Sequence, residues 1–149
     1  WQANRQRCGT RSLTLPARNL HYDLDQVMAL QSGTGYVDLH NDYELVSAQH
    51  DVTRCYLHFV KRTAEWVKVP DPAHLALAFE QVHYFQQSEG LQLPTSVEEI
   101  GFKEPNDFDM DWFMERPESE KDHILFRLGD NQFIRIGAEA CVTLCSKPG

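Results

Sequence analysis

The most pronounced hydrophobic pattern lies in residues 71–90, DPAHLALAFEQVHYFQQSEG. Its apolar side chains recur at the three- and four-residue spacing of one helix face: Leu75, Ala78, Phe79, Val82 and Phe85. Asp71 suits an N-cap, Pro72 suits the first helical position and Gly90 suits the end of a helix. The pattern therefore predicts a principal amphipathic helix over residues 72–88, docked on a sheet by its apolar stripe.

Alternation of apolar and polar residues predicts strands in most of the remaining chain. In VTRCYLHFV (52–60), the side chains of Cys55, Leu57 and Phe59 share one face, and AEWVKV (64–69) is the expected neighbouring strand. These segments favour an antiparallel meander of three or four strands, because short turns join antiparallel neighbours.

The C-terminal third also alternates. HILFRL and QFIRIG flank the turn at residues 129–131, which predicts a β-hairpin. EACVTLC follows as a final strand, with Ala140, Val142 and Leu144 expected to face inward.

Shorter elements complete the prediction. GYVDLHNDYELVSAQHD predicts two strands around a turn at residues 40–42. The segment from Leu24 to Gln31 predicts a short helix, and Thr95 or Ser96 is expected to cap one further helical turn.

These elements together predict an α+β fold. We expect a mainly antiparallel sheet of about six to eight strands, with the principal amphipathic helix packed on one face. The length of 149 residues fits a single domain over residues 1–149. Residues 1–11 are expected to form a flexible N-terminal arm.

Composition narrows the classes of function. No apolar run approaches the roughly 20 residues of a membrane-spanning helix, so we expect no membrane span. Lys and Arg number 14 against 22 Asp and Glu, which gives a net charge of −8. That charge repels a phosphate backbone, and basic residues gather only near the N-terminus, so no nucleic acid is expected as a partner.

The four cysteines are relevant to the cellular compartment of the protein. Cys141 and Cys145 are about 13 Å apart on a strand at ~3.3 Å per residue, too far to bridge each other. Any disulfide therefore has to include Cys8 or Cys55, and in an extracytoplasmic protein we expect at least one to join either of them to the strand that carries Cys141 and Cys145. The chain begins with Trp followed by arginines at positions 5 and 7, as after a removed anchor or signal segment or at a domain boundary. A periplasmic or secreted location is slightly favoured over buried thiols in a cytosolic protein.

The segment from Glu104 to Asp122 carries most of the negative charge, with eight acidic and two basic residues and a net charge of −6. DFDMDWFM within it alternates strictly and predicts a strand. Asp107, Asp109 and Asp111 would share its outer face. Phe108, Met110 and Trp112 would share the opposite face and point into the core. Phe113 would then lie on the face of the three aspartates as an aromatic anchor.

Metal binding and carboxylate catalysis fit this segment less well. The aspartates resemble a calcium-binding rhythm but lack the required Gly turn and bidentate Glu. A carboxylate pair for a glycosidase is easily formed by chance among eight acids. Taken by itself, the segment is better explained as a solvated strand face and acidic loop that keep the protein soluble than as a docking surface. His40 and His50 could oppose each other across a hairpin, although surface imidazoles without a metal are favoured; we expect no cofactor and no metal.

We therefore expect a non-enzymatic binding protein of the inhibitor or toxin-neutralising (immunity) type, which engages a basic protein partner through an acidic surface. The absence of a complete catalytic motif favours this class only weakly. The alternatives are a small hydrolase using Asp or Glu with His, and a solute-binding or structural module. The expected partner-binding residues are Asp107, Asp109, Asp111, Phe113, Glu115, Glu118 and Glu120.

Overall fold

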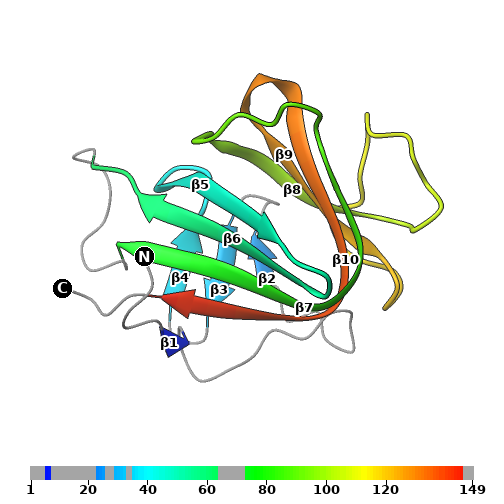
Figure 1. The fold of residues 1–149 in the computed structure, drawn as a ribbon, viewed down its shortest axis with the longest axis horizontal. Coiled ribbons are helices and arrows are strands. Elements are labelled where there is room, and N and C mark those ends of the chain that lie inside the picture. The colour runs from blue at the N-terminus through cyan, green and yellow to red at the C-terminus, as the bar shows by residue number, and fades with distance from the viewer. Residues whose placement is uncertain (1–5, 8–22, 26–28, 33–34, 64–72, 146–149) are drawn as a thin grey trace.

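Antiparallel β-strands make up nearly all of the regular structure (Figure 1). The computed structural model describes residues 6–7, 23–25, 29–32, 35–63 and 73–145. The strands are β1 (Gln6–Arg7), β2 (Asp23–Asp25), β3 (Ala29–Ser32), β4 (Gly35–Asp38), β5 (Tyr43–His50), β6 (Arg54–Lys61), β7 (His74–Gln87), β8 (Val97–Lys103), β9 (His123–Leu128) and β10 (Gln132–Cys145). Within these ranges the only helical element is a 3-10 turn, Gly129–Asn131.

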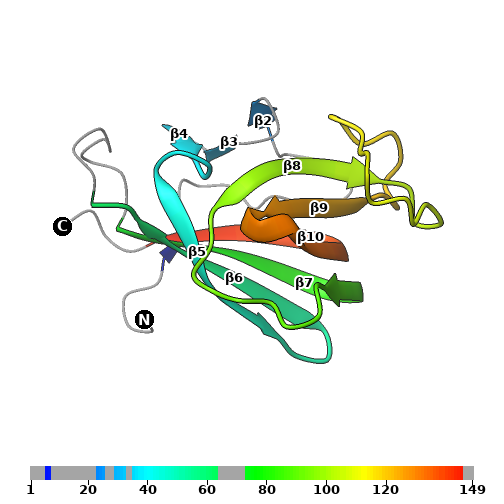
Figure 2. The same cartoon turned by 90° about the horizontal axis from the view of Figure 1, so that it is seen from above.

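Two sheets are formed. The larger has the order β5-β6-β7-β10-β9-β8, with β1 paired to the end of β10, and the smaller has the order β2-β3-β4. β7 and β10 have 14 residues each and pair along most of their length. Both strands bend, so β8, β9 and the first half of β10 turn over β5 and β6 (Figures 1 and 2). The outer strands meet where the backbones of Leu45 and Thr95 exchange two hydrogen bonds of 2.9 Å.

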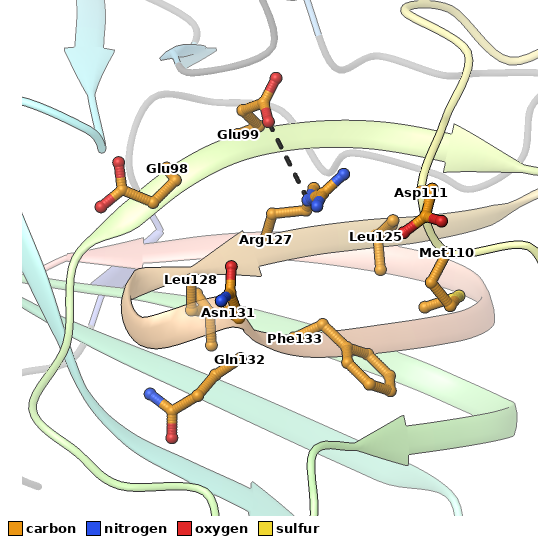
Figure 3. Close-up of a pocket in the computed structure, with 10 residues that line it drawn as sticks. All are labelled: Glu98, Glu99, Met110, Asp111, Leu125, Arg127, Leu128, Asn131, Gln132 and Phe133. Carbon is orange, nitrogen blue, oxygen red and sulfur yellow. Dashed lines mark ion pairs between the residues drawn. The ribbon is translucent and has the colours of Figure 1, made fainter.

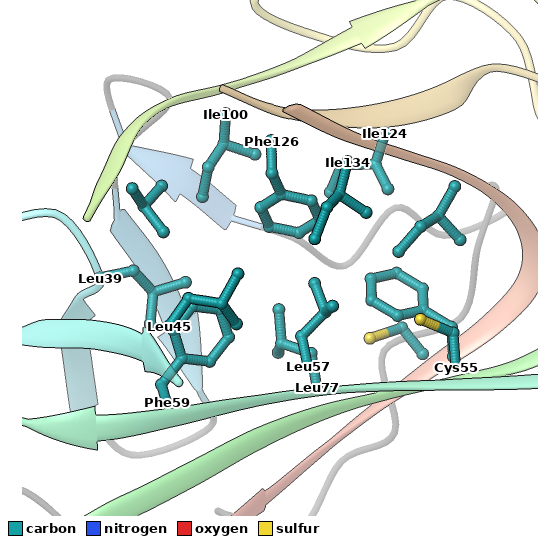
Figure 4. Packing of buried hydrophobic residues seen from close by; sticks show 14 of the residues in the cluster. Leu39, Leu45, Cys55, Leu57, Phe59, Leu77, Ile100, Ile124, Phe126 and Ile134 are labelled. Carbon is teal, nitrogen blue, oxygen red and sulfur yellow. The ribbon is translucent and has the colours of Figure 1, made fainter. Parts of the chain in front are cut away.

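The core fills the space enclosed by this curved sheet. Side chains from β5, β6 and β7 face side chains from β8, β9 and β10 across it (Figure 4). Cys55, Leu57 and Phe59 are all fully buried, which confirms the alternation predicted for their strand. Phe79 meets Phe126 edge-to-face, with ring centroids 6.3 Å apart, so the two halves of the sheet contact each other directly.

The predicted principal helix is wrong, and with it the α+β class. Residues 74–87 form β7, in the middle of the sheet. Residues 75–79 are buried on both faces of this strand, so the apolar run is continuous and its periodicity does not distinguish a strand from a buried helix. An irregularity in the strand at Gln81, which has a φ of 54°, then moves the inward face from Phe79 to Val82 and imitates a helical spacing. The proposed N-cap at residues 71–72 lies outside the described residues.

Two smaller helical predictions are also wrong. β2 and β3 occupy parts of the segment in which a helix from Leu24 to Gln31 was expected, and they pair with each other. The segment after Thr95 is extended and enters β8. Short polar segments carry little helical preference of their own, and pairing with neighbouring strands decides their conformation.

The C-terminal hairpin is confirmed, because β9 and β10 pair antiparallel around the turn at residues 129–131. The final strand is a continuation of β10, and its inward face differs from the prediction. Cys141 and Thr143 are buried, whereas Ala140 and Leu144 are partly exposed. A register shift between Gly137 and Ala138 changes the phase of the alternation along β10, which a uniform two-residue pattern does not anticipate.

Neither Cys55 nor Cys141 takes part in the expected disulfide, and a bond between Cys8 and Cys145 stays a prediction. Both residues are buried thiols that lie opposite Phe79 from its two neighbouring strands. Burial raises the pKa of the Cys55 thiol to about 12, so this thiol is inert at neutral pH. Cys8 lies outside the described residues, as does the strand expected at 64–69. Of residues 1–11, Gln6 and Arg7 form β1 on β10, and the others lie outside the described residues.

Candidate functional site

The acidic residues 104–122, called the acidic loop below, connect β8 to β9 as a loop of turns and bends. The predicted strand is therefore wrong here. Phe108 is 64% exposed and Trp112 is 45% exposed, although alternation placed both in the core. The aspartates explain this difference, because a short carboxylate side chain that accepts hydrogen bonds from nearby backbone N–H groups favours turns over strand pairing.

Consecutive aspartates build these turns. The Asp107 carboxylate accepts a hydrogen bond from the backbone N–H of Asp109 at 2.9 Å, and the Asp109 carboxylate accepts one from Asp111 N–H at 3.0 Å. Two of the three aspartates are thus occupied in shaping the loop. Asp111 is exposed, and its carboxylate has neither a hydrogen bond nor an ion pair within the part of the chain that the structure describes.

Arg135 on β10 holds the acidic loop against the outer face of the sheet. This arginine is fully buried, and its guanidinium donates hydrogen bonds to the backbone carbonyls of Asp107 (2.6 Å), Glu104 (2.9 Å) and Pro105 (3.3 Å). It also lies 5.2 Å from the centroid of the Phe108 ring, a cation–π contact. A buried cation is stable only when its donors are satisfied, so the loop and Arg135 hold each other in place.

Lys103, the last residue of β8, is a second buried cation. Its side chain is fully buried; Nζ donates to the carbonyl oxygen of Trp112 at 2.7 Å and lies 4.2 Å from the centroid of the Trp112 ring. Nζ also lies 3.4 Å from Asp107 Oδ2. The hydrogen bond from Asp109 N–H, followed by Lys103 and Arg135, lowers the pKa of the Asp107 carboxyl against the opposing effect of burial.

His123, the first residue of β9, completes the support beneath the loop. It is buried, and its Nδ1 accepts a hydrogen bond from Arg135 Nε at 3.0 Å, which requires the neutral ring with its proton on Nε2. Burial, and then the charges of Arg135 and His83, lower the pKa of His123 to about 4. Tyr84 stacks on the ring at a centroid distance of 4.5 Å.

Glycines leave room for this packing at two positions. A Cβ at Gly101 would lie 1.9 Å from Cδ1 of Phe113, so the phenyl ring rests directly on the backbone of β8. A Cβ at Gly137 would lie 2.6 Å from the ring of His123. Phe113 is therefore half-buried against the sheet, and Met114 beside it exchanges two backbone hydrogen bonds of 2.8 Å with Phe102.

The remaining acidic residues lie in the second half of the loop. Glu115, Glu118 and Glu120 are exposed. Asp122 is buried instead, and its Oδ2 accepts hydrogen bonds from the backbone N–H of Glu118 (2.7 Å) and of Ser119 (2.9 Å). Asp122 thus shapes this half of the loop, as Asp107 shapes the first.

A cavity of about 420 Å³ opens beside the first half of the acidic loop (Figure 3). Met110 and Asp111 contribute from the loop, and Leu125 and Arg127 contribute from β9. The guanidinium of Arg127 forms a loose ion pair with Glu99, at 3.9 Å. The other lining residues are Glu98, Leu128, Asn131, Gln132 and Phe133.

The structure does not bring His40 and His50 together. β4 and β5 belong to different sheets, so no hairpin forms across the turn at residues 39–42. His40 Nδ1 lies 2.6 Å from the carbonyl oxygen of Val97, and His50 stacks on Phe85. Among the described residues, no group of three or more His, Cys, Asp or Glu is placed to hold a metal ion. No described helix has the length and apolar character to cross a membrane.

Neither a protein-family model, nor a curated protein, nor a solved structure matches the chain.

The uneven distribution of charge located the acidic segment in the sequence, but alternation did not identify the residues that support it. Lys103 and Arg135 were overlooked because basic side chains are rarely fully buried. One signal was present in the sequence: Lys103 follows the apolar residues of IGFK, and Arg135 follows the apolar residues of FIR. Lys103 is close to the acidic segment in sequence, and Arg135 is brought close to it by strand pairing. A single cation inside an apolar strand indicates a buried group that some nearby segment has to satisfy.

Proposed function

We propose that the chain is a non-enzymatic binding protein that engages a basic protein partner through the acidic loop, in the manner of a small inhibitor or toxin-neutralising protein. The observation that carries this proposal is the anchoring of two exposed aromatic rings, Phe108 and Trp112, on the buried cations Arg135 and Lys103. Rings that are held in place before binding lose little conformational freedom when a partner covers them.

The charge around the two rings favours one chemical class of partner. The loop carries a net charge of −6, and the two buried cations beneath it reduce the local net charge to −4. The cations are covered, whereas Asp109, Asp111 and Glu115 are exposed at the surface. An approaching partner therefore meets negative charge first, which favours a basic surface and accelerates its association.

The roles of the seven expected partner-binding residues are refined accordingly. Asp109, Asp111, Glu115, Glu118 and Glu120 are proposed to supply the attracting charge, since all five are exposed. Asp107 and Phe113 are proposed to act indirectly, by shaping the loop. Phe108 and Trp112 take over the role of aromatic anchors.

Binding kinetics test the proposal. The basic protein that the wild-type chain captures from its native source is purified, and its association and dissociation rates are measured at several salt concentrations. Changing Asp109→Asn, Asp111→Asn and Glu115→Gln together is expected to lower the association rate about threefold to tenfold at low salt and to flatten its salt dependence.

The matched control removes three exposed acids elsewhere, with Asp51→Asn, Glu89→Gln and Glu139→Gln. It has the same net charge but leaves the loop intact, so its association rate is expected to fall much less. Equal rates for the two triple variants would show that only the overall charge of the molecule matters, and the acidic loop would lose its proposed role.

A further inference from the structure

We infer that the cavity beside Asp111 receives one long basic side chain, Lys or Arg, of the partner. This inference rests on the proposed function and adds a specific contact to it. The cavity volume of about 420 Å³ lies within the roughly 300 to 1,000 Å³ of ordinary ligand pockets, and one extended side chain is smaller than that.

The walls of the cavity suit the two parts of such a side chain. Met110 and Phe133, which are partly exposed, provide an apolar surface (Figure 3) for the methylene stem. Long basic side chains characteristically lay their stem on apolar surface while the charged head stays near water or a counter-ion. The apolar wall alone would accept many ligands, so the charged residues of the lining decide which class of ligand the cavity favours.

The charges around the cavity favour a cation. Glu98, Glu99 and Asp111 line it together with one arginine, Arg127, which gives a net charge of −2. Arg127 already has Glu99 as a partner at 3.9 Å, so an anionic ligand would have to compete with that carboxylate. A cationic head gains from every acidic group in the lining.

Asp111 is the group that meets the cation. Asp107 is engaged by Lys103 and by Asp109 N–H, and Asp109 is engaged by Asp111 N–H. The Asp111 carboxylate has no such engagement within the described residues, and it belongs to the cavity lining. A charge-assisted hydrogen bond to Asp111 thus costs no existing contact.

The test uses a pair of small probes on the full chain labelled with ¹⁵N. Nα-acetyl-lysine methylamide carries the basic side chain, and Nα-acetyl-norleucine methylamide carries the same stem without the ammonium group. The lysine probe is expected to shift the backbone amide signals of Leu125, Arg127 and Phe133 in a saturable way, and the norleucine probe is expected to bind at least fivefold more weakly.

Two matched variants locate the contact. Asp111→Asn is expected to weaken the lysine probe about fivefold or more. Asp109→Asn, which removes the same charge but keeps an oxygen to accept Asp111 N–H, is expected to weaken it less than twofold. Equal binding of the two probes, equal effects of the two variants, or an absence of shifts around the cavity would each overturn the inference.

The two proposals fail separately. If the lysine probe does not bind but the triple acidic variant still slows association of the purified basic partner, the cavity inference is overturned and the proposed function stands. If the probe binds as expected but the triple variants do not differ, the cavity is a basic side-chain site and the proposed function is overturned.

Discussion

Both faces of β8, β9 and the first half of β10 contain buried side chains, but different contacts cover them. The inner face presents Ile100, Phe126 and Ile134 to the core, where apolar side chains cover one another. The outer face presents Lys103 and Arg135, which are equally buried but are covered by a loop and satisfied by its backbone. The same strands thus belong to a core that folding requires and to a platform whose purpose is to hold a loop.

The largest expected effect concerns the inner face. Phe79→Ala removes a fully buried ring that meets Phe126 across the core, and it is expected to cost about 3 to 5 kcal/mol of unfolding free energy. Chemical denaturation measures this cost. The loss is global, so the acidic loop and the strands are expected to unfold together; a cost below about 1 kcal/mol would contradict the burial of this strand.

The corresponding change on the outer face is Arg135→Met, which keeps an apolar stem and removes the charge. It is expected to cost about 3 kcal/mol, because the carbonyls of Glu104, Pro105 and Asp107 lose a charged donor. Hydrogen exchange is expected to increase first at the backbone amides of the loop. Arg127→Met, which removes only a loose and partly exposed pair, is the control and is expected to cost less than about 0.5 kcal/mol.

Lowering the pH distinguishes the two faces, because His123 lies only on the outer face. Its pKa of about 4 in the folded protein lies below its ordinary value near 6.5, so the unfolded chain binds the proton first and stability falls as pH falls through this window. Between pH 7 and pH 5 the loss from this group is expected to be about 2 kcal/mol.

Denaturation of the wild-type chain and of His123→Gln across this range measures that loss. The amide oxygen of Gln can accept from Arg135 Nε in place of the imidazole, but it does not titrate. The difference between the two chains is expected to shrink as pH falls. A difference that is constant from pH 7 to pH 5 would contradict the neutral state of His123.

The smallest expected effect on stability is at the loop surface. Trp112→Ala is expected to cost about 1 to 2 kcal/mol, because the lost cation–π contact is with the buried ammonium of Lys103 while nearly half of the Trp112 side chain is exposed. Binding to the proposed basic partner is expected to weaken far more. Val52→Ala, at another exposed apolar residue, is the control and should affect neither quantity.

The inner face was largely predictable from the sequence. Cys55, Leu57 and Phe59 alternate without interruption, and the hairpin around residues 129–131 has a turn rich in Gly, Asp and Asn. Where the alternation changes phase, at Gln81 and at Gly137, the prediction was wrong. Such a phase change depends on how neighbouring strands pair, and a pattern read along one strand does not contain it.

The outer face was not predictable in the same way. Trp112 and Phe108 were assigned to the core because their segment alternates, yet they lie on cations that are distant in the sequence. Arg135 and Phe108 are separated by 27 positions, and only the pairing of β8, β9 and β10 brings them together. The position of the acidic segment was predictable from the composition of the sequence, whereas its shape depends on long-range contacts that the sequence pattern does not show.

The position of β10 has a consequence for how the protein is made. β10 is the last strand along the described chain, yet it lies in the middle of the larger sheet, between β7 and β9. While a ribosome extends the chain, the facing edges of these two strands remain unpaired until residues 132–145 emerge. Unpaired edges are where nascent chains associate with one another, so slow synthesis of this last stretch should lower the soluble yield more than slow synthesis elsewhere.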